Sequence, residues 1–155
     1  MTKGGTTATD GRTLTIRGIT MDDAVEVAAL SCQLGYESTA EDLRRRLEEI
    51  LPLKDDHGIF IASLGDEVVG WGESEIMRHL QSDAHALITG LVVKDGIRSM
   101  GVGSRLCEAI ESWVKGRGVA VIRVTSRSIR ERAHRFYLRE GYTEIKISKV
   151  FEKSL

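Results

Sequence analysis

The glycine-bearing turn at residues 94–104 is the part of the sequence best suited to binding an anion. A short apolar run, residues 91–93, leads into this turn, and an amphipathic helical pattern follows it. The first backbone N–H groups of a helix have no partner within the helix, and together with the helix dipole they attract phosphate. Gly101 and Gly103 carry no Cβ, so phosphate oxygens can approach the backbone closely, and Arg98 adds a permanent positive charge. These residues predict a diphosphate site.

Two common phosphate-binding motifs do not fit this turn. Gly96 and Gly101 have the spacing of a P-loop, but Val102 and Gly103 stand where that motif requires lysine and a hydroxyl residue. A dinucleotide-binding fingerprint needs a small residue at the position of Leu106 and normally follows the first strand of the chain. A glycine-permissive start of a helix, with no ligand, stays open as the alternative.

Apolar periodicity and turn residues predict the elements that would position this site. Ser38 and Glu41 have the spacing of a capping box at the start of a helix, and Gly65-Asp66 has the composition of a hairpin turn. The order β-α-α-β-β-β-α-β-α-β predicts an α/β fold without an internal repeat. Strands are expected at residues 13–19, 59–64, 67–77, 84–93 and 119–125, helices at 22–34, 38–52, 101–117 and 129–140, and one or two closing strands in 142–151.

Length and composition predict one domain, residues 13–155, behind a flexible tail, residues 1–12. The chain has 155 residues, of which 41% are hydrophobic and 29% charged, a usual balance for a globular protein. No apolar run is long enough for a membrane span or a signal peptide, and the two cysteines are widely separated, so we expect a cytoplasmic protein.

Charge is unevenly distributed along the chain. Residues 34–80 hold 5 basic and 11 acidic residues, whereas residues 94–155 hold 14 basic and 7 acidic ones. The C-terminal half is therefore expected to meet an anion and the central part a cation, with solvated surface charge as the alternative.

Two motifs together resemble the GNAT superfamily of N-acetyltransferases. Arg98-x-x-Gly101-x-Gly103 after an apolar strand is similar to the acetyl-CoA motif of this family. Arg130-x-x-Ala133-His134-Arg135-Phe136-Tyr137-x-x-x-Gly141-Tyr142 is similar to the family's helix after its fifth strand, although relatives often carry Asn where this chain has Arg130. The resemblance covers roughly residues 13–155. It implies a mixed, mostly antiparallel central sheet of six to seven strands flanked by four helices.

The resemblance implies acetyl-CoA as the cosubstrate and no metal. In this family the backbone of the fourth strand pairs with the pantetheine arm, and the amides of the glycine-bearing turn hold the pyrophosphate. The fourth and fifth strands splay apart at a bulge, for which Gly90 is the candidate. The cofactor-binding residues implied are Leu91, Val92, Val93, Arg98, Ser99, Met100, Gly101, Val102, Gly103, Ser104, Ala133 and Phe136.

The resemblance also implies a direct attack by a primary amine in a ternary complex. Tyr137 would be the general acid that protonates the departing thiolate, with a packing aromatic as the alternative. The fourth strand carries no carboxylate, so Glu73 and Glu75, which share one face of the preceding strand, are the candidate general bases unless that face is solvated. Tyr36 and Glu37 would bind the substrate, and this acidic mouth favours a small cationic amine.

Other functions remain open at this stage. One is a regulatory module that binds CoA without turnover, and another is acetylation of a protein N-terminus or lysine. Six arginines between residues 123 and 139 raise a nucleic-acid binder as a rival. Phe136 and Tyr137 lie opposite the arginines at helical spacing, which favours burial over stacking on bases. We therefore expect a small-molecule amine as the partner, no nucleic acid and no membrane, and leave a homodimer open.

Overall fold

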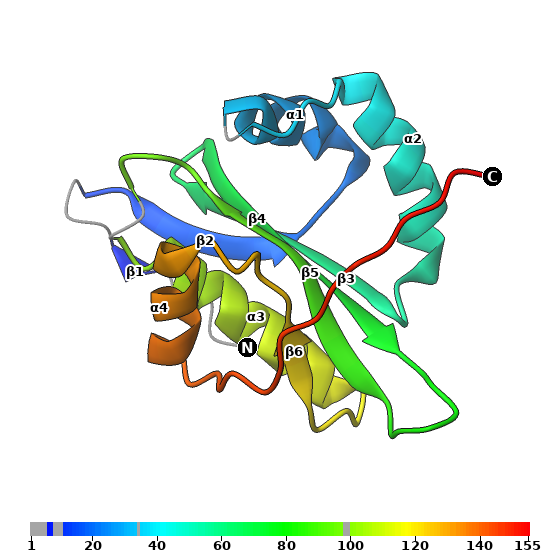
Figure 1. The fold of residues 1–155 in the computed structure, drawn as a ribbon. Coiled ribbons are helices and arrows are strands. Elements are labelled where there is room, and N and C mark those ends of the chain that lie inside the picture. The colour runs from blue at the N-terminus through cyan, green and yellow to red at the C-terminus, as the bar shows by residue number, and fades with distance from the viewer. Residues whose placement is uncertain (1–5, 8–10, 34, 98–99) are drawn as a thin grey trace. The chain divides into compact units, whose positions relative to one another are not determined.

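The computed structural model describes residues 6–7, 11–33, 35–97 and 100–155, which are coloured in Figure 1. The chain divides into two compact units, one ending at Val124 and the other running from Thr125 to Leu155. Each unit is described by itself.

The first unit is built on a mixed, mostly antiparallel sheet. Its six strands follow one another in sequence order, and each pair of neighbours is antiparallel except β5 and β6, which are parallel. The strands are β1 (Thr6–Thr7), β2 (Thr13–Gly18), β3 (His57–Leu64), β4 (Glu67–Met77), β5 (His85–Val93) and β6 (Ile122–Val124). The expected sheet type is confirmed.

The expected count of six to seven strands needs a correction. Residues 142–151, predicted to form one or two closing strands, carry no strand in the structure. Alternating Ile145 and Ile147 give strand propensity, but a strand exists only through hydrogen bonds to a neighbour, which propensity does not supply. The sheet reaches six strands because it includes the two-residue strand β1. This strand was not predicted, since it lies within the segment expected to be a flexible tail. The other expected tail residues lie outside the described ones, except Gly11 and Arg12.

Four helices accompany the strands, as expected. Helices α1 and α2 cover one face of the sheet and α3 the other, as Figure 1 shows. They are α1 (Ala24–Gln33), α2 (Ala40–Ile50), α3 (Val102–Gly116) and, in the second unit, α4 (Glu131–Arg139), with short 3-10 turns η1 (Met21–Asp23) and η2 (Leu51–Leu53) beside α1 and α2. Val102 and Leu106 of α3 pack on Leu14, Ala62 and Val69 to form a fully buried core.

Glycines on β4 decide which side chains face which helix. A Cβ at Gly70 would lie 3.2 Å from the side chain of Val102, and one at Gly72 would lie 3.0 Å from that of Ile110. Because both glycines lie against α3, the alternation of the strand turns Trp71 and Glu73 to the opposite face, where α1 and α2 pack.

A bulge interrupts β5 at the position that the sequence indicates. Glu73 pairs with Gly90 and the next residue, Ser74, pairs with Ile88, so that Thr89 is an extra residue on β5. The parallel pairing of β5 with β6 covers only Ala86 to Ile88. The bulge beside Gly90 is therefore confirmed, and β6 is shorter than the strand expected over residues 119–125.

The cap of α2 lies one residue later than expected. The Thr39 hydroxyl accepts a hydrogen bond from the Asp42 amide at 3.1 Å, and the Thr39 amide donates to the Asp42 carboxylate at 3.1 Å. Both Ser38/Glu41 and Thr39/Asp42 have the spacing of a capping box, and the chain uses the second. The hydroxyl of Ser38 is left to interact elsewhere, and it accepts a hydrogen bond from Arg46 at 3.0 Å.

An ion pair fixes the corner between β2 and α1. Two nitrogens of the Arg17 guanidinium donate to the two oxygens of Asp23 at 2.8 and 2.7 Å, and the Thr20 amide donates to the same carboxylate at 2.8 Å. The Asp23 side chain is only 6% exposed. The hydrogen bond from Arg17 is the main cause that lowers the pKa of Asp23, against a smaller opposing effect of burial.

We predict that Asp23→Asn lowers the free energy of unfolding by about 1–3 kcal/mol at pH 7, because a charge-assisted pair is lost. The folded-state pKa of Asp23 is lowered, so its stabilisation is full above the unfolded pKa of about 3.9 and disappears as pH falls through the folded value. Urea denaturation at a series of pH values should show the difference from wild type shrinking below about pH 4.

The control is Asp22→Asn, which removes the same charge from the exposed neighbouring residue. It should change stability by less than about 0.5 kcal/mol. A difference between Asp23→Asn and wild type that stays constant from pH 7 to pH 3 would show that the ionised carboxylate is not what stabilises this corner.

Candidate functional site

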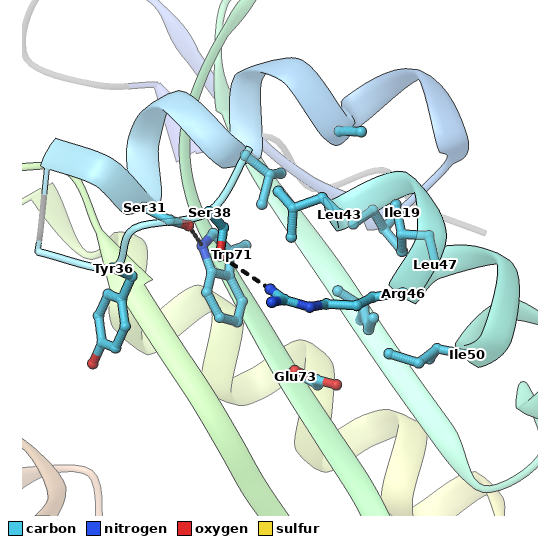
Figure 2. A pocket seen from close by; sticks show the side chains of 13 residues that line it. Ile19, Ser31, Tyr36, Ser38, Leu43, Arg46, Leu47, Ile50, Trp71 and Glu73 are labelled. Carbon is cyan, nitrogen blue, oxygen red and sulfur yellow. Dashed lines mark hydrogen bonds between the residues drawn. The ribbon is translucent and has the colours of Figure 1, made fainter. Parts of the chain in front are cut away.

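A pocket of about 210 Å³ opens between α1, α2 and the face of β3 and β4 that these helices cover (Figure 2). Apolar side chains make up most of its wall, and a few polar groups project into it, the composition that small-molecule sites share. Its lining residues are Ile19, Ala24, Val27, Ser31, Tyr36, Ser38, Leu43, Arg46, Leu47, Ile50, Ile59, Trp71 and Glu73.

Trp71 connects three elements at this pocket. Its indole N–H donates a hydrogen bond to the hydroxyl of Ser31 on α1 at 3.2 Å, drawn as a dashed line in Figure 2. A Cβ at Gly90 would lie 2.5 and 2.7 Å from two ring atoms of Trp71, closer than non-bonded carbon atoms approach each other. The ring therefore lies over Gly90 only because this residue has no side chain.

Tyr36 reaches the pocket through the turn that ends α1. Gly35 adopts a left-handed conformation with φ +87°, its amide donates to the Cys32 carbonyl, and the Tyr36 amide donates to the Ser31 carbonyl. The end of this helix at Gly35 was expected from the sequence. Tyr36 lines the pocket and is 48% exposed, whereas Glu37 is exposed and is not among the lining residues.

The two candidate bases differ in position. Glu73 lines the pocket, and its carboxylate lies 3.3 Å from Nε2 of His57, with the two side chains 22% and 13% exposed. Glu75 is the direct cross-strand neighbour of His57 and is not among the lining residues. Sequence reasoning missed His57, because its proximity to Glu73 follows from the register of β3 against β4.

Arg46 is a second residue that sequence reasoning missed. It lines the pocket together with Leu43, Leu47 and Ile50 of the same helix, and Figure 2 shows its side chain reaching across the cavity toward Ser38. The signal was present in the run Arg44-Arg45-Arg46, because residues 43, 46, 47 and 50 share one helical face.

A second group of predicted residues lies along β5. Leu91, Val92 and Val93 pair with Gly72, Trp71 and Gly70 of β4. This part of β5 lies beyond Ile88, where the pairing with β6 ends. Backbone groups on that edge are placed where an extended ligand could add to the sheet.

The start of α3 has the geometry of an anion site. Gly101 adopts a left-handed conformation with φ +75°, and the amide of Arg105 donates the first helical hydrogen bond, to the Gly101 carbonyl at 3.0 Å. The amides of Val102, Gly103 and Ser104 come before that of Arg105 and lie in the first turn of the helix. Space around Gly101 is open, since a Cβ there would meet nothing within 4 Å.

The residues of this turn differ in burial, and two of them lie outside the described residues. Val102 is fully buried in the core and Met100 packs against it, so an anion could meet these two residues through the backbone alone. Arg98 and Ser99 lie outside the described residues, and their assignment to the cofactor stays a prediction.

The second unit carries Tyr137, Phe136 and Ala133 on α4. The Tyr137 ring meets the edges of Phe136 and Tyr142, with ring centroids 5.2 and 5.7 Å apart. Gly141, with φ +94°, ends the helix as expected, and the Tyr142 amide donates to the Tyr137 carbonyl at 2.9 Å. These contacts hold the Tyr137 ring on one side of the helix.

Within the described part of the chain, no group of three or more His, Cys, Asp or Glu side chains is placed to hold a metal ion. Among the same residues, no helix combines the length and the apolar character needed to cross a bilayer.

Comparison with known proteins identifies the family. The family model of the GNAT acetyltransferases matches residues 24–142. The chain belongs to this family. It is 30% identical over 139 residues to the aminoalkylphosphonate N-acetyltransferase of Salmonella typhimurium (strain LT2), a match that covers 83% of this chain and 84% of that protein. As a GNAT family member with such relatives, the chain is an acyltransferase.

Two further likenesses agree with this assignment. The chain is 25% identical over 146 residues to aminoglycoside N(6')-acetyltransferase type 1 of Klebsiella aerogenes, with 90% of this chain and 96% of that protein covered. A solved aminoglycoside N-acetyltransferase in complex with CoA superimposes with a TM-score of 0.82 at 19% identity and covers 94% of this chain and 97% of that one. The second likeness shows that this GNAT protein has the same fold.

We predict that Gly90→Ala displaces the Trp71 ring and lowers the free energy of unfolding by about 1–3 kcal/mol, the usual cost of overpacking. Denaturant unfolding measures the loss, and the near-ultraviolet circular dichroism of the indole reports the displacement. The matched control is Gly116→Ala, because a Cβ at Gly116 meets nothing within 4 Å and α3 favours alanine over glycine. Equal stability of Gly90→Ala and wild type would show that the position of the Trp71 ring does not depend on the missing side chain at residue 90.

Proposed function

We propose that this GNAT protein transfers an acetyl group from acetyl-CoA to a small primary amine bound in the pocket beneath α1 and α2. One observation carries the proposal: Glu73, which lines the pocket, is the cross-strand partner of Gly90 at the bulge of β5. The acceptor pocket and the edge of β5 beyond Ile88 therefore meet at a single position on the sheet.

Backbone geometry supports the binding of acetyl-CoA. The edge of β5 at Leu91 to Val93 suits the extended pantetheine arm, and the first amides of α3 with the open space at Gly101 suit the pyrophosphate. The CoA complex of the solved relative with the same fold agrees with this assignment. Acetyl-CoA would supply a thioester whose carbonyl carbon is open to attack by an amine.

Glu73 is proposed as the general base. An amine is protonated at neutral pH and must lose a proton before or during its attack, and Glu73 can accept it directly or through water. His57, 3.3 Å from the carboxylate, holds Glu73 in place. Glu75 remains the second candidate, and its position outside the pocket lining favours Glu73.

Tyr137 is proposed as the general acid. A thiolate leaves more readily when a proton donor is at hand, and a phenol hydroxyl can give that proton. Contacts with Phe136 and Tyr142 hold the ring in place within its own unit. The proposed role of Tyr137 therefore belongs to its hydroxyl group alone.

The pocket favours a small acceptor over a protein segment. Its volume of about 210 Å³ lies below the roughly 300–1,000 Å³ that is usual for drug-sized ligands. Relatives named for acetylation of aminoglycosides and aminoalkylphosphonates act on small amines. Turnover with small amines would also separate this proposal from a regulatory module that only binds CoA.

Release of CoA from acetyl-CoA in the presence of a panel of small amines tests the proposal. We expect Glu73→Gln to lower kcat by about 10²-fold or more, because general-base contributions are about 10²–10⁴-fold. The remaining activity should rise with pH, since only amine that is already unprotonated can attack.

Glu75→Gln is the matched control, because it makes the same change on the same strand and face outside the pocket lining. Its kcat should stay within about threefold of wild type. Loss in Glu75→Gln alone would reverse the assignment of the base. Wild-type protein that neither binds acetyl-CoA nor acetylates any amine would overturn the proposed function.

Tyr137→Phe tests the acid. The ring and its packing remain, whereas the proton donor is lost, so kcat and kcat/KM should fall together by about 10-fold to a few hundredfold. Isothermal titration should find the affinity for acetyl-CoA nearly unchanged. A kcat within twofold of wild type, in a folded variant, would make Tyr137 a packing residue.

A further inference from the structure

Two side chains of opposite charge line the mostly apolar acceptor pocket. Arg46 enters from α2 and Glu73 from β4, and Figure 2 shows both beside the ring of Trp71. The proposed reaction uses Glu73, but it gives no role to a permanent cation in the same cavity.

Each charge has its own partner on the protein. Arg46 donates a hydrogen bond to the Ser38 hydroxyl at 3.0 Å, and Glu73 lies 3.3 Å from His57. Among the ion pairs of the described residues, Arg46 and Glu73 are not joined to each other. Arg46 is exposed and Glu73 half-buried, yet both line the same mostly apolar pocket, so a ligand that carries the two complementary charges can meet both.

Arg46 retains donors for such a ligand. The guanidinium has five N–H groups in a planar fork, and the hydrogen bond to Ser38 uses one nitrogen. Asp42, an acidic neighbour on the same helix, accepts a hydrogen bond from the Thr39 amide, the main cause that lowers its pKa, and lies 3.7 Å from Arg45. The charges of both Arg46 and Arg45 also help to lower this pKa, but among the ion pairs of the described residues Asp42 is joined to Arg45 and not to Arg46. The shift of the cap from Ser38 to Thr39 thus leaves the Ser38 hydroxyl to orient Arg46 into the pocket.

We propose that the acceptor is a short amine that also carries an oxyanion, a carboxylate or a phosphonate, bound by Arg46 while the amine meets Glu73. This inference rests on the proposed function and names the substrate class for the same pocket. A cavity of about 210 Å³ restricts the acceptor to a few carbon atoms between the two groups. A diamine or polyamine would instead bring a second ammonium group toward Arg46, where like charges repel.

The first arm of the test compares acceptors of similar length. Acetylation of β-alanine and 2-aminoethylphosphonate should proceed with kcat/KM at least tenfold above that of propylamine and of 1,3-diaminopropane. A diamine that is the better substrate would overturn the inference, and so would equal rates for all four, although either result would leave the proposed acetyl transfer intact.

The second arm uses Arg46→Gln, which keeps a polar amide on the same helix face but removes the charge. The ratio of kcat/KM for 2-aminoethylphosphonate to that for propylamine should fall about 10-fold to 100-fold, as expected for the loss of a charge-assisted hydrogen bond. Arg45→Gln is the matched control, because Arg45 is the adjacent residue on α2 and is exposed like Arg46, but it is not among the lining residues. An unchanged ratio in Arg46→Gln would overturn the inference.

The third arm needs no catalysis. Propylphosphonate carries the anion but no amine, so its binding can be followed by isothermal titration in every variant. Wild type and Arg45→Gln should bind it, whereas Arg46→Gln should bind at least tenfold more weakly. Binding that is absent in wild type, or equal in Arg46→Gln, would overturn the anion site. Binding that depends on Arg46 in a protein unable to transfer an acetyl group would support the site and refute the proposed function.

Discussion

The Trp71 ring lies against Gly90 of the neighbouring strand, and this contact joins the elements that surround the pocket. Any side chain at position 90 would occupy the space of the ring. With the ring in that place, its N–H reaches Ser31, so a single side chain connects β5, β4 and α1. A half-buried indole needs such a hydrogen-bond partner, and the position of the helix over the sheet is fixed in return.

The bulge next to this contact positions Glu73, the proposed general base. An extra residue at Thr89 shifts the register of β5, so that Glu73 comes to lie opposite Gly90. The same stretch of β5 loses its pairing with β6 after Ile88. The bulge therefore places Glu73 opposite Gly90 close to the point where the pairing of β5 with β6 ends, in keeping with the frequent occurrence of bulges beside active sites.

Features that depend on local sequence were predictable. The bounds of β4 and the end of α1 at Gly35 follow from glycines and alternation within a few residues, whereas the bulge was implied by the family resemblance and only its site, Gly90, by the local sequence. These signals are strong because glycine changes the backbone or the available space directly.

Features that depend on distant partners were not predictable in the same way. Two overlapping capping boxes have the right spacing at the start of α2, and the spacing alone does not show that the chain uses Thr39 and Asp42. The approach of His57 to Glu73 requires the register of two strands, and the alternating residues 142–151 have strand propensity without forming a strand. Arg46 belongs to a run of three arginines, and the sequence does not show that, of these three, only Arg46 lines the pocket.

Amide NMR can show whether acetyl-CoA and the acceptor amine bind on either side of the bulge of β5, as proposed. In ¹⁵N-labelled protein, desulfo-CoA should shift the amides of Gly90 to Val93 and of Val102 to Ser104. A subsequent addition of 2-aminoethylphosphonate should shift the indole N–H resonance of Trp71, one of two tryptophans in the chain. The other tryptophan, Trp113, lies on α3. If saturating desulfo-CoA left the β5 amides unmoved, or if the acceptor shifted only the Trp113 indole, the two ligands would not meet at the bulge.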